Sequence, residues 1–163
     1  MPLFLKKILC FIATLGPIGF LPAPGTAGSL AALIAGWFIA SNGFAALALA
    51  TLAALLVGIL ASQIYSQMTN SKDASEVIID EVAGQWAVLL AIPPMIDGAI
   101  YWYGAAFILF RFFDITKIGP VGMAERLEGG IGIMADDIVA GGLAGMCLLA
   151  MQFALYAMQV FPF

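Results

Sequence analysis

The sequence contains no histidine, only two cysteines, and charge on only 10% of its 163 residues. Without histidine, the chain cannot use a histidine-based phosphatase mechanism or a Ser-His-Asp hydrolase triad. Cys10 and Cys147 lie in apolar segments and are too few for a disulfide framework, so we interpret them as small buried hydrophobic residues. Neither cysteine precedes a phosphate-cradling loop that ends in arginine. The sequence also lacks the GxxxxGK motif of nucleoside triphosphate sites and the Asp-x-Asp pair of soluble aspartyl-phosphate enzymes.

The scarcity of charge places the chain in a membrane. Hydrophobic residues make up 63% of it and its mean hydropathy is +1.07, whereas soluble domains carry about 25% charged residues. The length suffices for one domain, residues 1–163, with roughly four to six crossings of about 20 residues each. No basic patch indicates a nucleic-acid partner.

Turn-forming residues divide the apolar sequence into helices. Residues 8–21 run into a stretch rich in proline and glycine, which favours a short interfacial or re-entrant helix over a full crossing, although a full crossing stays open. The turn signals "SNG" (41–43) and "PPMIDG" (93–98) each indicate a helical hairpin. We therefore expect an all-α integral membrane protein with about five transmembrane helices. The expected crossings are residues 29–40, 44–62, 82–92, 99–113 and 138–160.

This threading puts all six lysines and arginines on one face of the membrane. The positive-inside rule makes that face cytoplasmic. Nine of the ten acids fall on the same face, and Asp97 is the exception.

The first polar cluster on the cytoplasmic face is "IIDEVAG" (78–84), in which Asp80 and Glu81 directly precede an apolar helix. Acids at a helix N-terminus also stabilise the helix through its partial positive charge, so a purely structural role is the alternative.

The second cluster is "FRFFDITKIGP" (110–120), where Arg111, Asp114 and Lys117 recur every three residues. This spacing predicts that all three lie on one side of a helix, either as a functional set or as a ladder of ion pairs.

The third cluster consists of Asp136 and Asp137, which we expect to begin the last helix after a flexible, glycine-rich approach at 129–132. A helix cap needs one acid, and two adjacent acids call for another explanation.

These three clusters bring five carboxylates to the membrane edge, where their mutual repulsion requires a counter-charge. A divalent cation supplies it, and oxygen donors without histidine favour Mg²⁺ over zinc. Arg111 and Lys117, here called the site cations, then fit the binding of a phosphate. The pattern predicts metal-assisted phosphoryl chemistry. The five carboxylates, here called the site acids, are Asp80, Glu81, Asp114, Asp136 and Asp137.

A further candidate element is "PGTAGS" (24–29), which we expect to be a loop before a helix start at residue 29. Backbone N–H groups there could hold a phosphate oxygen, with Thr26 or Ser29 assisting. The alternative is an ordinary turn or cap.

Four motifs in order carry a resemblance over nearly the whole chain. The sequence resembles the phosphatidylglycerophosphatase A family of integral membrane lipid phosphatases. The resemblance implies a Mg²⁺-dependent enzyme of the bacterial inner membrane that removes the terminal phosphate of phosphatidylglycerophosphate at the cytoplasmic face, giving phosphatidylglycerol. It also implies that the site acids and site cations match the acidic and basic residues of the family's motifs. The motifs are "PGTAGS" (24–29), "IIDEVAGQ" (78–85), "FRFFDITK" (110–117) and "GGIGIMADDIVAG" (129–141).

The chain departs from the family pattern after Lys117, where Ile118 and Gly119 replace a usual proline and a frequent aromatic residue, and at Glu125, which stands near a usual aspartate. The roles of Glu125 and Arg126 are therefore open.

We expect Mg²⁺, held by some of the site acids, to polarise the phosphomonoester while the site cations neutralise its oxygens. Attack by water with a carboxylate as base and attack by a carboxylate both remain open, as does the oligomeric state. Two other classes compete. A metal-dependent phosphatidyltransferase would need an Asp-Gly-x-x-Ala-Arg string, which is missing. A transporter could use the acids as an ion path.

Overall fold

The computed structural model describes residues 1–71, 74–93 and 99–160, and none of these residues lies in a β-strand. The predicted all-α class is confirmed. The helices are α1 (Leu3–Ala13), the 3₁₀-helix η1 (Ile18–Phe20), α2 (Pro24–Ala40), α3 (Phe44–Thr69), α4 (Ile79–Leu89), α5 (Ala99–Thr116), α6 (Pro120–Ala124) and α7 (Gly129–Val160).

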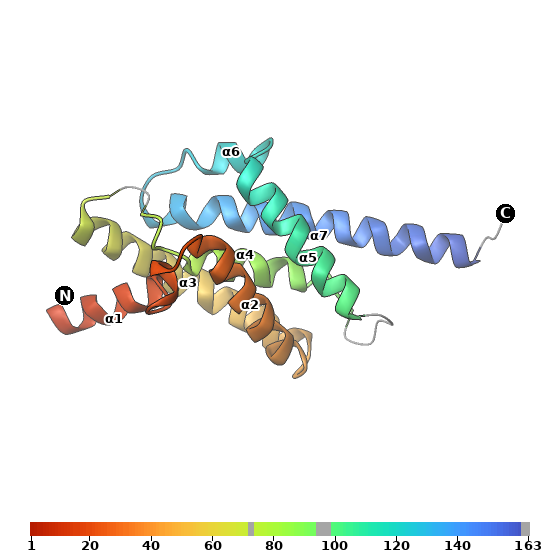
Figure 1. The fold of residues 1–163 in the computed structure, drawn as a ribbon, viewed down its shortest axis with the longest axis horizontal. Coiled ribbons are helices and arrows are strands. Elements are labelled where there is room, and N and C mark those ends of the chain that lie inside the picture. The colour runs from red at the N-terminus through yellow and green to blue at the C-terminus, as the bar shows by residue number, and fades with distance from the viewer. Residues whose placement is uncertain (72–73, 94–98, 161–163) are drawn as a thin grey trace.

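Helix α4 is the central element, packed against α2, α3, α5 and α7 (Figure 1). Its apolar side chains Val82, Val88 and Leu89 are buried. Helix α7 crosses α4 at very short range, because a Cβ on Gly141 would overlap the carbonyl oxygen of Gly84. The two glycines thus let α7 bring its polar residues close to the start of α4.

Only α3 and α7, among the described helices, are both long and apolar enough to cross a membrane, and α2 is a shorter apolar helix. The expected number of about five crossings is therefore not met. The clearest discrepancy is α4, whose 11 residues cover roughly 16 Å of a hydrocarbon core of about 30 Å. Most of the expected break at 93–98 lies outside the described residues.

The N-terminal helix lies earlier in the chain than expected. It covers Leu3–Ala13 instead of 8–21, and the chain then turns at Gly16, whose φ of +63° favours glycine. Leu9 and Ala13 are the buried residues of this helix, and they lie in the same apolar cluster as Ala61 and Tyr65 of α3.

Three helices extend beyond their expected ends. Helix α2 begins at Pro24, so "PGTAGS" is its first turn and a half and not a loop. Proline suits a first helical position because its missing N–H would have no partner there. Helix α3 continues to Thr69, and α5 to Thr116. The turn at 41–43 is confirmed, with Gly43 at φ +100°.

Helix α7 begins at Gly129, so the predicted flexible approach and the predicted helix start at Asp136 are both wrong. Tertiary packing explains the early start. A Cβ on Gly130 would overlap the carbonyl oxygen of Ile59 on α3, and one on Gly132 would overlap that of Leu127. These glycines serve close packing, which overrides their low helix propensity.

Candidate active site

One cavity of about 780 Å³ opens where the N-terminal ends of α2, α4 and α7 meet the C-terminal end of α5. All five site acids and both site cations line it. Thr26 lines it as well, from the first turn of α2. The structure therefore brings together groups that lie as far apart in sequence as residues 26 and 137.

Three of the site acids lie close together in the cavity. One carboxylate oxygen from each of Asp80, Glu81 and Asp137 lies within 4.8 Å of the others. Asp137 is only 3% exposed and Asp136 only 7%. One oxygen of each of Glu81, Asp136 and Asp137 is buried without a hydrogen-bond donor in the described part of the chain. Because buried oxygens normally have partners, these three indicate that the site takes up a ligand, a cation or a proton that the chain itself does not supply.

The pKa of Asp80 on α4 also supports a cation in this cluster. Burial, and then the adjacent charge of Glu81, raise the pKa of Asp80 well above the usual value for aspartate, and Asp137 adds to the rise. A carboxylate in this setting ionises readily only when positive charge is brought next to it.

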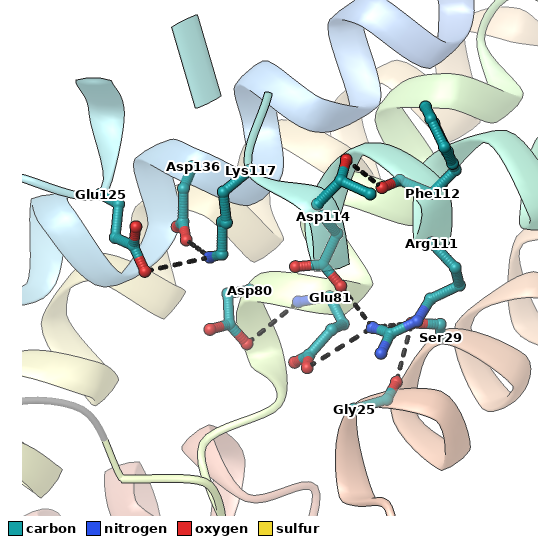
Figure 2. Close-up of polar contacts among 11 residues, drawn as sticks. Gly25, Ser29, Asp80, Glu81, Arg111, Phe112, Asp114, Lys117, Glu125 and Asp136 are labelled. Atoms are coloured by element: carbon teal, nitrogen blue, oxygen red, sulfur yellow. Dashed lines mark hydrogen bonds and ion pairs between the residues drawn. The ribbon is translucent and has the colours of Figure 1, made fainter. Parts of the chain in front are cut away.

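Arg111 lies on one side of the clustered acids and contacts two of the site acids. It forms an ion pair with Asp114, one turn later on α5, and its Nη1 lies 3.9 Å from Oε1 of Glu81 (Figure 2). The same Nη1 donates to the hydroxyl of Ser29 at 3.3 Å, and that hydroxyl donates to the carbonyl of Gly25 at 2.8 Å. Ser29 is fully buried and contacts the guanidinium without lining the cavity. The hydroxyl of Ser29 is therefore placed to orient the guanidinium group of Arg111.

Lys117 holds the other side. The residue lies just after α5 in a left-handed conformation, with φ of +51°, so it does not share a helix face with Arg111 and Asp114 as expected. Its ammonium group forms an ion pair with Asp136 and lies 3.8 Å from Oε1 of Glu125 (Figure 2). Burial alone would lower the pKa of Lys117, but the pair with Asp136 and the charge of Asp137 raise it overall. The lysine is therefore charged at neutral pH.

Acids within hydrogen-bonding reach of paired cations, in a cavity with room for a ligand, are typical of phosphoryl chemistry. The comparison with known proteins agrees, because residues 11–152 match the phosphatidylglycerophosphatase A family. The chain belongs to this family. Membership confirms the predicted enzyme class: it is a lipid phosphatase of the phosphatidylglycerophosphatase type.

Three curated relatives cover most of the chain. A putative phosphatidylinositol-3-phosphatase of Bacteroides thetaiotaomicron is 44% identical, over 76% of this chain and 80% of the relative. The phosphatidylglycerophosphatase A of Haemophilus influenzae is 39% identical, over 81% and 80%. That of Escherichia coli is 32% identical, over 72% and 67%. No solved structure matches the chain.

Two features of this phosphatase were missed by sequence reasoning. Gly25 lies so close to the site that a Cβ there would overlap Oε1 of Glu81 and lie 3.3 Å from Arg111. Gln85, one turn after Glu81, is fully buried, and neither polar atom of its side chain has a hydrogen-bond partner in the described residues. Both residues lie in the quoted motifs. Gly25 is a glycine of "PGTAGS", and Gln85 is a polar residue in the otherwise apolar part of the helix that follows Asp80 and Glu81.

Glu125 and Arg126, whose roles the sequence left open, both line the cavity from the turn that follows α6. Glu125 reaches Lys117, whereas Arg126 forms no ion pair in the described part of the chain.

Proposed function

We propose that the chain hydrolyses the terminal phosphomonoester of phosphatidylglycerophosphate to phosphatidylglycerol and phosphate, using Mg²⁺, at the cytoplasmic face of the bacterial inner membrane. The observation that carries this proposal is the convergence of three carboxylates within 4.8 Å in a cavity that two site cations also line.

The donor set fits a magnesium ion. Asp80, Glu81 and Asp137 would hold it, because they offer hard oxygen ligands and two of them have a buried oxygen without a donor. When bound, the metal supplies Lewis-acid polarisation of a phosphoryl oxygen. Two or three carboxylates leave room for waters and a phosphate oxygen among its ligands, as Mg²⁺ prefers.

The site cations bind and orient the phosphomonoester. Arg111 presents a planar fork of donors that matches two phosphate oxygens, and Ser29 fixes the orientation of that fork. Lys117 adds a compact charge on the opposite side, next to Asp136. Thr26 is exposed and lines the cavity, so its hydroxyl is a candidate donor to a third oxygen. Together these donors offset the charge that gathers on the phosphoryl oxygens during displacement.

The hydrolysis itself needs a nucleophile and a base. Water attacks phosphorus in line and gives a proton to a site acid that does not bind metal. The bond from phosphorus to the lipid oxygen breaks, and the same acid returns the proton to that oxygen, so phosphatidylglycerol and inorganic phosphate leave. Asp136 suits this proton transfer, because one of its oxygens is paired with Lys117 while the other is buried without a donor.

In the membrane, α3 and α7 form two crossings, and we infer that α2 and α5 cross beside them. The exposed side chains of α2 and α5 are largely apolar, including Leu30 and Phe38 on α2 and Ile100 and Ile108 on α5. Such surfaces suit contact with lipid. Helix α4 lies buried between the crossings and need not span the bilayer itself. The site end carries Arg111, Lys117 and Arg126, and under the positive-inside rule this supports a cytoplasmic orientation of that end.

A second candidate substrate is a phosphorylated phosphatidylinositol. The observation that favours it is the 44% identity to the Bacteroides thetaiotaomicron relative, whose name is putative phosphatidylinositol-3-phosphatase. Both substrates carry a phosphomonoester on a polyol that a phosphodiester links to diacylglycerol. The same assay can therefore compare the rates at which the site hydrolyses the two lipids.

The test is phosphate release by the purified protein in detergent micelles. Phosphatidylglycerophosphate and phosphatidylinositol 3-phosphate are supplied separately, with Mg²⁺, with EDTA, and with EDTA followed by excess Mg²⁺. We expect release from phosphatidylglycerophosphate that EDTA abolishes and Mg²⁺ restores. Faster release from the inositol lipid would replace the first substrate by the second. A phosphatidyltransferase would need a nucleotide-activated lipid, and a transporter would release no phosphate from either lipid.

A further inference from the structure

The cavity has a second region that the proposed phosphomonoester site does not use. Its volume of about 780 Å³ is far larger than a phosphate group needs, and its lining includes Ile115, Arg126 and Leu127. Ile115 is 67% exposed and Leu127 54% exposed, so both present apolar surface at the rim. The lining of this cavity thus includes a third cation and exposed apolar side chains in addition to the acids.

Arg126 differs from the other two cations of the cavity in its pairing. Arg111 is paired with Asp114, and Lys117 with Asp136. Arg126 has no carboxylate partner among the described residues, and only its backbone N–H is engaged, donating to the carbonyl of Met123 at 3.3 Å. Its guanidinium charge is therefore available to an anionic ligand.

The turn that carries Arg126 is tied to the phosphomonoester site. Glu125 precedes it directly and lies 3.8 Å from Lys117, which pairs with Asp136. The backbone N–H of Glu125 also donates to the carbonyl of Val121 at 3.1 Å. Through Glu125 and Lys117, this arrangement connects the turn that carries Arg126 to Asp136, and Leu127, the next residue, also lines the cavity.

We propose that Arg126 forms a second anion subsite that binds the phosphodiester of the lipid substrate, with Ile115 and Leu127 contacting the first carbons of its diacylglycerol part. This inference rests on the proposed function. In a lipid that bears a terminal phosphomonoester on its headgroup, the phosphodiester is a single negative charge between a polar headgroup and apolar chains. A free cation and exposed apolar side chains that line the same cavity match these two groups, whereas a water-soluble phosphate ester would leave the apolar side chains unused.

The proposal predicts that Arg126 sets the preference between two lipids that differ in the phosphodiester. Phosphatidylglycerophosphate has one, and phosphatidic acid with the same acyl chains carries its phosphomonoester directly on diacylglycerol. Steady-state hydrolysis of both is measured in mixed micelles for the wild type, Arg126→Gln and Arg126→Lys. If the wild type does not hydrolyse phosphatidic acid, the inhibition constant of phosphatidic acid against phosphatidylglycerophosphate hydrolysis is measured instead.

We expect Arg126→Gln to raise KM for phosphatidylglycerophosphate about tenfold or more, as loss of a charge-assisted hydrogen bond does. The kcat for phosphatidylglycerophosphate should change less than about twofold. The KM or inhibition constant for phosphatidic acid should also change less than about twofold. Arg126→Lys should recover part of the loss, because it restores the charge but not the fork. Lys7→Gln on α1, which removes an exposed cation outside the cavity, is the matched control and should leave both constants unchanged.

A binding measurement separates this role from a structural one. Phosphatidylglycerol carries the diester without the monoester, so it should inhibit the wild type and inhibit Arg126→Gln about tenfold more weakly. An equal loss toward both substrates, or unaltered inhibition by phosphatidylglycerol, would overturn the subsite. Absence of phosphate release by the wild type from every lipid would overturn the proposed function instead.

Discussion

Gly25 on α2 lies directly against the carboxylate of Glu81 on α4, with no space for a Cβ between the two helices at that point. Gly25→Ala should therefore displace Glu81 or Arg111 and lower kcat, by roughly tenfold or more, because small displacements in a catalytic site are expensive. Phosphate release measures the loss. Gly142→Ala on α7 is the matched control, since its Cβ would meet no atom within 4 Å, and alanine there should keep full activity.

Asp137→Asn tests the metal site. The change removes one of the three clustered carboxylates, so we expect Mg²⁺-dependent phosphate release to fall by roughly a hundredfold or more in a protein that still folds. The second readout is thermal unfolding. Added Mg²⁺ should raise the Tm of the wild type, because ligand binding to the native state stabilises it, and should raise that of Asp137→Asn much less.

Glu125→Gln serves as the control for this comparison, because Glu125 lines the cavity but lies outside the three clustered carboxylates. It should keep the Mg²⁺-dependent rise in Tm. Retention of most activity by Asp137→Asn would remove Asp137 from the site.

Lys117 and Asp136 can be tested as a pair. Lys117→Met leaves the buried carboxylate of Asp136 without its cation, so the variant should lose stability by about 1 kcal/mol or more. Asp136→Asn in the Lys117→Met background should recover much of that loss, because the unpaired charge is gone. Urea unfolding in detergent measures both. Additive effects of the two substitutions would show that the pair contributes nothing to folding.

The orientation in the membrane is open to cysteine labelling. In a background with Cys10→Ser and Cys147→Ser, Asn42→Cys and Glu128→Cys place single thiols in the turn after α2 and in the segment before α7. A membrane-impermeant maleimide should label position 42 in intact cells and position 128 only after the membrane is opened. Labelling of both from the same side would contradict the proposed topology.

The sequence predicts the class of fold because its apolar runs are separated by turn signals such as that at 41–43. It does not predict the starts of α2 and α7. Both starts are rich in glycine, which has low helix propensity, so local preference favours loops there. Helix α7 starts early because Gly130 fits against the carbonyl of Ile59 on α3, and α2 because Gly25 fits against the carboxylate of Glu81 on α4. Both contacts depend on tertiary packing.

The charged residues of the site can be predicted from the sequence because charge is rare in this chain. In a chain this apolar, each charge has to be explained, and all seven predicted charged residues line one cavity. Three features depend on spatial neighbours and stay hidden in the sequence. These are the departure of Lys117 from the helical face, the bond between Ser29 and Arg111, and the free charge of Arg126.

The early start of α7 has a consequence for depth in the bilayer. The helix has 32 residues, so at about 1.5 Å per residue it is roughly 48 Å long and exceeds a hydrocarbon thickness of about 30 Å. In the proposed topology, about two turns of this surplus precede Asp136 at the charged end. The aspartates would then lie near the phosphate layer of the leaflet. A lipid could thus present its phosphomonoester to them without lifting its acyl chains out of the membrane.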